Sequence, residues 1–252
     1  HKTVDPASAS CQYSTLHSQY ETRRPTMYSP HLWPGGETDD LERVESQVDT
    51  IDCFDINAKD QYGRTLLALA ATSGNLSLTK LLLKCDGVDT NIKDVGGMTP
   101  LGHAAMWNQA AILDLFLQDG SVDVNCRDNR GDTPLAFAAE QGNETVVVSL
   151  LCREDVQPDS RNDALATPLA MAAERGHERV VLLLLNHAGV EADSTDKEGC
   201  TPLARAAAMG FERIVRLLLD CPGVNVNSRD NDGYTPVSYT HLEPTRPERI
   251  SY

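Results

Sequence analysis

Residues 128–151, DNRGDTPLAFAAEQGNETVVVSLL, contain one full copy of a pattern that recurs along this chain of 252 residues. Its threonine, Thr133, has counterparts at a constant spacing of 34 residues, at Thr65, Thr99, Thr167, Thr201 and Thr235. Proline follows five of these six threonines, and an Ala-Ala pair lies five and six residues after five of them. A constant period of this length is the signature of a protein built from stacked structural repeats.

Each repeat is predicted to begin with a short helix. Thr133 has the hydroxyl of a helix N-cap, which accepts a backbone N–H that has no partner within the helix, and Pro134 has no N–H to leave unpaired. The following Ala-Ala pair keeps one side of the helix thin, so the next repeat can approach closely. Nine residues after the threonine stands a glycine in most repeats, and Asn108 in the second one. Both residue types adopt the left-handed conformation that ends a helix.

A second helix, a link and a turn complete the predicted repeat. The second helix is indicated by apolar residues at helical spacing, such as Ile112, Leu115 and Phe116. The link after it has the pattern Val-x-x-Asn or Val-x-x-Asp, and we expect it to be extended and strand-like. A polar turn such as residues 128–131 then leads to the next threonine.

The turn of the fourth repeat differs from the others. Leu165 takes the position that is glycine in every other turn. Because a left-handed leucine would cost roughly 1–2 kcal/mol, we expect the turn at residues 162–166 to be rearranged, with Asn162 or Asp163 in the left-handed position.

The whole pattern, D-x-x-G-x-T-P-L-x-x-A-A-x-x-G-x-x-x-x-V-x-x-L-L-L, resembles the ankyrin repeat over roughly residues 41–239. The resemblance implies an all-α fold, a solenoid of stacked helix-loop-helix units joined by β-hairpin-like turns. The units here are 34 rather than the usual 33 residues long, with the extra residue in the link. The His that usually follows T-P-L in the family is replaced by Ala, Gly or Ser, so the hydrogen bonds of that His are not implied.

The pattern also divides the chain into segments. We expect a disordered or linker segment at 1–37, a degenerate N-terminal capping half-repeat at 38–59, five repeats at 60–93, 94–127, 128–161, 162–195 and 196–229, the start of a truncated sixth repeat at 230–239, and a non-repeat tail at 240–252. This tail has two interpretations, a non-native product of a truncated or misjoined reading frame or a genuine short tail. The chain begins with His rather than Met, and we expect it to be a fragment of a larger protein.

Composition and charge exclude several classes of partner. A formal net charge of −15 argues against binding to nucleic acid or to an anionic membrane, because neutralising phosphates requires Lys and Arg on one face. The acidic residues are spread over turns and links, as on a solvated surface, with a cation-recruiting patch as the alternative. The sequence contains no run of 18 apolar residues, so it predicts no membrane span. Seven scattered cysteines without C-x-x-C spacing predict reduced thiols and an intracellular, cytoplasmic protein, with the nucleus not excluded.

No motif in the sequence predicts catalysis. The seven histidines lack metal-binding spacing, and neither G-x-S-x-G nor a phosphate-binding G-x-x-x-x-G-K is present. We therefore expect no enzyme activity, no cofactor, no metal and no small-molecule substrate. The remaining function is that of a scaffold or adaptor that binds a protein partner of unknown identity. The alternative is a sensor or regulatory array within a larger multidomain signalling protein, such as a nucleotide-binding receptor.

The resemblance also implies where a partner would bind. In the family, the concave face of the stack contacts partners through the turn residues, the residue before the threonine and the two residues before the inter-helix glycine. The second repeat is distinct because it places apolar side chains at these positions, and Trp107 is either a binding anchor or a side chain folded back over its own loop. The candidate partner-binding residues are Tyr62, Arg64, Met98, Met106, Trp107, Arg130, Asp132, Glu140, Glu174, Arg175, Met209 and Tyr234.

Overall fold

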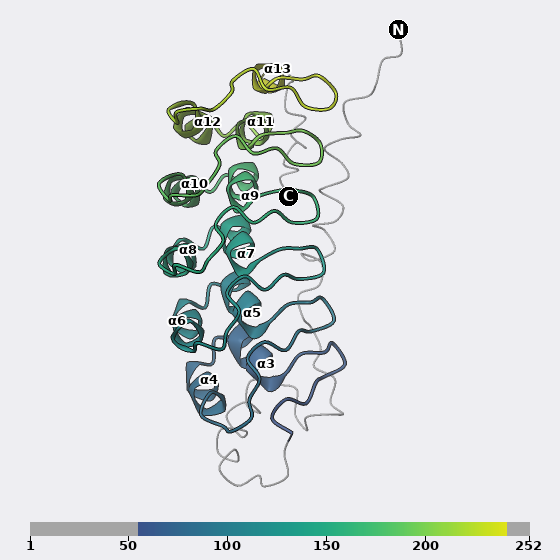
Figure 1. Cartoon of the computed structure of the whole chain (residues 1–252), viewed down its shortest axis with the longest axis vertical. Helices are drawn as coiled ribbons and strands as arrows, with labels where there is room; N and C mark the ends of the chain where they lie inside the picture. Colours follow the sequence, from purple (N-terminus) through teal and green to yellow (C-terminus); the bar gives the residue numbers. More distant parts are fainter. Residues whose placement is uncertain (1–54, 241–252) are drawn as a thin grey trace, which may run out of the picture. The chain divides into compact units, whose positions relative to one another are not determined.

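The computed structural model describes residues 55–240 of the chain, so the predicted segment at 1–37, most of the predicted capping half-repeat and residues 241–252 lie outside the described residues. The described part contains only helices and turns (Figure 1). The helices are α3 (Leu66–Ser73), α4 (Leu76–Leu82), α5 (Pro100–Met106), α6 (Ala110–Gln118), α7 (Pro134–Gln141), α8 (Glu144–Leu151), α9 (Pro168–Arg175), α10 (Glu178–Leu185), α11 (Pro202–Ala208), α12 (Glu212–Leu219) and α13 (Pro236–Thr240).

The helices form two parallel rows (Figure 1). The first helices of the repeats, α3, α5, α7, α9, α11 and α13, stack directly on one another, and the second helices, α4 to α12, form the other row. Hairpin-like turns project from the first-helix row on the side away from the second helices. The predicted all-α solenoid is therefore confirmed. No helix within residues 55–240 has the length and apolar character needed to cross a membrane.

The predicted helix ends are confirmed. The hydroxyl oxygen of Thr133 accepts the N–H of Ala136 at 3.3 Å, and the threonines that precede α3, α5, α9 and α11 cap their helices in the same way. Gly142 ends α7 in the left-handed conformation, and Asn108 takes that conformation after α5 with φ 56°. These local signals are sufficient to start and stop each first helix.

The core lies between the two helix rows and between successive repeats. The Ala-Ala pairs of all five complete repeats are buried, which lets neighbouring first helices pack closely as predicted. Large apolar side chains, including Phe116 and Phe137, fill the space between the rows. Since each repeat buries its apolar residues against its neighbours, the stack is stabilised as a unit.

The prediction of a strand-like link is wrong. Residues 86–93 after α4 contain two successive turns, the links of the later repeats do the same, and no strand occurs within residues 55–240. Asn91 shows why, because its Nδ2 donates to the carbonyl of Ser121 at 2.7 Å and its Oδ1 accepts the N–H of Asp123 at 2.9 Å. The side chain of one link thus satisfies backbone groups of the next link, which would otherwise require a strand partner.

Asn57 and Asn125 bridge their links in the same way as Asn91. The equivalent residues of the next two repeats are Asp159 and Asp193, which cannot donate a hydrogen bond when ionised. The Oδ1 atom of each is buried without a hydrogen-bond partner. Burial raises the pKa of Asp159, and the nearby carboxylate of Glu191 adds to this effect.

We predict that Asp159→Asn stabilises the chain by about 1 kcal/mol near neutral pH, because an amide restores the donor at a buried position. Denaturant unfolding measures this change. The raised pKa means that the folded parent chain takes up a proton more readily than the unfolded one, so the advantage of the variant decreases as the pH falls. Asn125→Asp is the matched reverse substitution and should destabilise the chain. If Asp159→Asn lowers stability, the link does not need this donor.

One side-chain oxygen fixes the shape of each hairpin. Asp128 Oδ1 accepts the backbone N–H groups of Arg130 and Asp132, both at 2.8 Å, and the Asp128 N–H donates to the carbonyl of Asp132 at 3.0 Å. The N–H of Asn129 then donates to the carbonyl of Gly96 in the preceding hairpin at 2.9 Å. The same tip-to-tip bond joins all six hairpins, through the N–H groups of Val95, Asn129, Asp163, Lys197 and Asn231.

The predicted rearrangement of the fourth hairpin is wrong. Leu165 keeps the left-handed conformation, with φ 58°, and the hairpin has the same hydrogen bonds as its neighbours. Asn162 Oδ1 accepts the N–H groups of Ala164 and Ala166, and the N–H of Asp163 donates to the hairpin before it. Because each such bond contributes about 0.5–1.5 kcal/mol, the set outweighs the strain of one left-handed leucine.

We predict that Leu165→Gly raises the free energy of unfolding by about 0.5–1 kcal/mol, since relief of the left-handed strain exceeds the entropy that glycine loses on folding. Leu165→Ala is the control, because alanine keeps the Cβ atom that causes the strain. Thermal unfolding of the two variants measures the difference in their stability. A glycine variant that is less stable than the alanine variant would show that the hairpin is unstrained.

Candidate functional site

The hairpins and first helices form the surface that carries the candidate residues. We call it the hairpin face and define it by residues 60–73, 94–107, 128–141, 162–175, 196–209 and 230–240. Large apolar side chains on folded proteins are mostly buried, yet this face exposes seven of them. They are Tyr62, Val95, Trp107, Leu165, Met209, Tyr234 and Val237.

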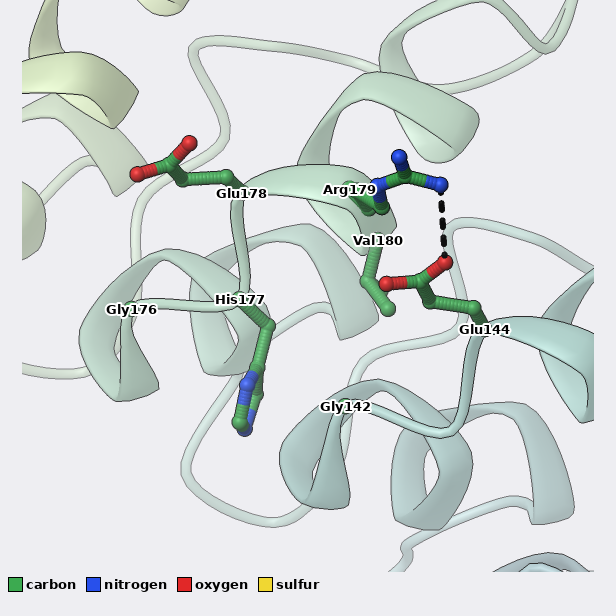
Figure 2. A pocket seen from close by; sticks show the side chains of 7 residues that line it. All are labelled: Gly142, Glu144, Gly176, His177, Glu178, Arg179 and Val180. Carbon is green, nitrogen blue, oxygen red and sulfur yellow. Dashed lines mark ion pairs between the residues drawn. The ribbon is translucent and has the colours of Figure 1, made fainter.

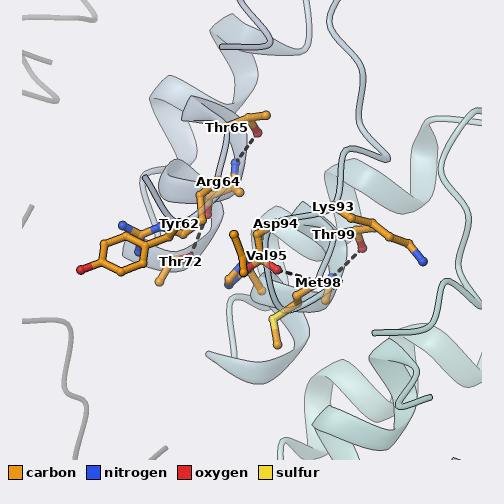
Figure 3. A network of polar contacts seen from close by, with 12 residues as sticks. Tyr62, Arg64, Thr65, Thr72, Lys93, Asp94, Val95, Met98 and Thr99 are labelled. Carbon is orange, nitrogen blue, oxygen red and sulfur yellow. Dashed lines mark hydrogen bonds and ion pairs between the residues drawn. The ribbon is translucent and has the colours of Figure 1, made fainter. Parts of the chain in front are cut away.

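The first two hairpins place two of these side chains on neighbouring tips (Figure 3). Tyr62 points outward from its hairpin, and the N–H of Val95 donates to the Tyr62 carbonyl at 2.9 Å. The Arg64 guanidinium lies 4.9 Å from the centre of the Tyr62 ring and pairs with Asp60 at 2.7 Å. The arginine therefore holds the ring in place while its own charge is balanced by Asp60.

The second repeat differs in part from expectation. Trp107 keeps 47% of its surface exposed after α5, so its ring is partly covered and partly open, and Met106 is half-buried. Met98 is only 6% exposed and is not accessible to a partner in this structure. Met98 is buried because Gly102 has no side chain. A Cβ atom at residue 102 would lie 2.9 Å from Met98 Cγ. The methionine side chain occupies space that an alanine would fill.

Asp132 is the second candidate that the structure removes from the surface. Its side chain is 2% exposed, accepts a hydrogen bond from Asn162 Nδ2 at 2.8 Å and pairs with Arg130 at 3.0 Å. Asp132 thus connects the third and fourth hairpins. Burial raises its pKa to about 6, with further contributions from the nearby Asp128 and Glu140 carboxylates.

The other charged candidates form ion pairs between repeats. Glu140 pairs with Arg175 of the next repeat at 2.9 Å, and Glu174 lies 4.0 Å from Arg205. Arg205 also pairs with Asp196 at the base of its own hairpin. Each arginine on the hairpin face is therefore paired with a carboxylate of this chain.

The partners of the hairpin-base carboxylates were not predicted from the sequence. His103 and Arg205 occupy the same position in their repeats, and each bonds to the hairpin-base aspartate nine residues before it, with 3.0 Å between His103 Nε2 and Asp94 Oδ2. The only signal in the sequence is this nine-residue spacing. It is weak, because Phe137 and Met171 occupy the same position in the repeats between them.

A shallow hollow lies between the loops that precede α8 and α10 (Figure 2). Its polar groups already have partners within the stack. Arg179 pairs with Glu144 at 3.5 Å, and His177 Nε2 donates to the carbonyl of Glu140 at 2.8 Å. We therefore assign no ligand to this hollow. It has a volume of about 250 Å³ and is lined by Gly142, Glu144, Gly176, His177, Glu178, Arg179 and Val180.

The hairpin face is acidic. Its sequence contains eleven Asp and Glu residues but only five Lys and Arg residues. Because its four arginines are paired with carboxylates, the surplus charge that a partner would meet is negative.

Comparison with protein families identifies the repeats. A family model described as ankyrin repeats in three copies matches residues 38–128 and again residues 109–196. A model of a single ankyrin repeat matches residues 198–231. These matches cover well over half of the chain. A comparison with curated proteins found no match.

The buried Asp132 gives stability a defined pH dependence. Its pKa is about 6 in the folded chain, against an ordinary value of 3.8, so the folded chain binds the proton first as the pH falls. This group therefore stabilises the fold progressively as the pH decreases from about 7 to about 4. We predict that the free energy of unfolding of Asp132→Asn, relative to the parent chain, falls over this interval.

Unfolding curves at several pH values check this prediction, with Asp163→Asn as the control because it changes an exposed carboxylate of the neighbouring hairpin. A difference between Asp132→Asn and the parent chain that stays constant with pH would contradict the assignment.

Proposed function

The chain belongs to the ankyrin-repeat family, whose repeats are protein–protein interaction modules, and we propose that it is a non-catalytic scaffold or adaptor that binds a protein partner on the hairpin face. This face corresponds to the one that the family presents to partners. A regulatory array within a larger signalling protein would use the same residues, so the proposal holds for either setting. An intracellular location remains a prediction.

One observation supports this proposal above the others, namely that exposed apolar side chains such as Tyr62 and Val95 stand on hairpins joined by backbone hydrogen bonds, with Trp107 exposed at the end of α5. A rigid surface loses little conformational entropy on binding, so its apolar contacts contribute more to affinity. Trp107 and Tyr62 are the candidate anchors, because large aromatic side chains dominate the energy of most interfaces.

Charge defines the second property of the partner. The hairpin face has a surplus of acidic residues, and its arginines are held by carboxylates of this chain. A partner segment with Lys or Arg beside aromatic or aliphatic side chains matches both features. An acidic segment would meet like charge. The two anchors and the acidic surplus together define the expected ligand class.

Selection of peptides from a random phage-displayed library against the full chain tests the proposal directly, since the library samples every combination of charge and apolar character. We predict enrichment of peptides that combine basic with aromatic or aliphatic residues, and binding that weakens as salt increases. Trp107→Ala should weaken binding of the selected peptides by about 2 kcal/mol. Isothermal titration calorimetry measures this loss.

Leu182→Ala is the matched control, because Leu182 is similarly exposed but lies on the second-helix row. It should leave peptide affinity unchanged. The proposal fails if Trp107→Ala and Tyr62→Ala both bind the selected peptides as tightly as the parent chain, or if Leu182→Ala removes binding.

A further inference from the structure

The second-helix row carries a different exposed surface. Two positions of each second helix are exposed in every repeat at the 34-residue spacing. One runs from Ser77 to Arg213, and the other, three residues later on each helix, supplies five residues of differing charge and polarity. We call these last five positions the outer column. In the order of α4, α6, α8, α10 and α12, the outer column reads Lys80, Asp114, Val148, Leu182 and Arg216.

The two central residues of the outer column are apolar. Val148 is 43% exposed and Leu182 is 45% exposed, on helices that are neighbours in the stack. Neither side chain is needed for the core, because α8 and α10 each bury three other apolar residues completely. The same column is charged in the other three repeats. The apolar pair is therefore a local feature of this face and not a requirement of the repeat.

The charges beside the apolar pair are arranged with opposite sign at its two ends. Asp114 precedes Val148 along the column, and Arg216 follows Leu182. Asp114 forms no ion pair within residues 55–240. Arg216 lies 3.7 Å from Glu212 on its own helix, but both side chains are strongly exposed, and such pairs contribute little. Both charges are therefore available to a partner.

We infer that this face binds a second copy of the chain. A two-fold axis placed between Val148 and Leu182 brings Val148 of one copy opposite Leu182 of the other, so the two apolar pairs cover each other. The same rotation places Asp114 of each copy opposite Arg216 of the other. The column is thus complementary to itself when reversed, which is the property that a two-fold symmetric interface requires.

A parallel arrangement of the two copies fits less well. Two copies placed in the same direction would oppose Asp114 to Asp114 and Arg216 to Arg216, which is repulsive. The outer column therefore selects the reversed arrangement. Its apolar part is small compared with the interface of a stable dimer, so the self-association is weak and reversible.

Sedimentation equilibrium of the full chain over a wide concentration range, at low salt, tests the inference. We expect a reversible monomer–dimer equilibrium. Leu182→Lys places a charge in the apolar pair and should raise the dimer dissociation constant at least about tenfold. Val95→Lys is the matched control, because Val95 is an exposed apolar residue on a hairpin tip, and it should leave the equilibrium unchanged.

Exchanging the charges of Asp114 and Arg216 tests whether these two residues pair across the dimer or whether any change of surface charge weakens it. Asp114→Arg alone and Arg216→Asp alone should each weaken the dimer, since each places like charges opposite each other twice. The double variant exchanges the two charges and should restore dimerisation to near the parent level. All the substituted positions are exposed, and circular dichroism verifies that each variant is folded.

Three results would overturn the inference. These are a parent chain that is monomeric at every concentration, a dimer that Leu182→Lys does not weaken, and a double variant that dimerises no better than the single variants. None of these results affects peptide binding at the hairpin face, which lies on the other helix row, so the two proposals fail independently.

Discussion

The hairpins depend on one side-chain oxygen at their first position. Asp or Asn there accepts the N–H groups of the second and fourth residues that follow it, so the hairpin closes without a strand. The next residue is then free to donate its N–H to the preceding hairpin, at 2.8–2.9 Å in all five cases. Because these bonds involve only backbone groups and one recurring type of acceptor, they leave the tip side chains free to vary. The base of each hairpin sets its shape, and the side chains at its tip take no part in setting it.

This division explains the chemistry of the hairpin face. The side chains that support the hairpin bases differ from repeat to repeat, as Arg64, His103 and Arg205 illustrate, yet each satisfies a buried or half-buried carboxylate. Such groups would be costly to leave unpaired. These charged side chains therefore pair with one another within the stack, whereas Tyr62 and Trp107 remain exposed. The face that results is rigid, apolar at its anchors and acidic in balance.

Prediction from the sequence succeeded for the helix ends, which depend on residues within a single repeat. Thr133 and Gly142 bound α7 as expected, and Asn108 takes the place of glycine in the left-handed position without changing the loop. Most of the failures occur where a neighbour 30 to 33 residues away decides the outcome. Leu165 stays left-handed because the two adjacent hairpins form hydrogen bonds with the backbone of Asp163 and Ala164 beside it. The links form no strand because an asparagine side chain reaches the next link. Asp132 is buried because Asn162 of the next repeat binds it. Met98 is buried for a reason within its own repeat, since Gly102 makes room for its side chain. The partner-binding role of the remaining candidates stays a prediction.

Native-state hydrogen exchange of the five hairpin-tip amides tests most directly whether the hairpin face is formed in the free chain. These amides belong to Val95, Asn129, Asp163, Lys197 and Asn231, whose side chains lie at the surface but whose N–H groups donate to the preceding repeat. If the tip-to-tip bonds hold the face in place, these amides exchange far more slowly than the amides of an unstructured loop, with free energies of opening that approach those of the neighbouring first helices. Exchange at the rate of an unstructured chain would contradict a pre-formed binding face.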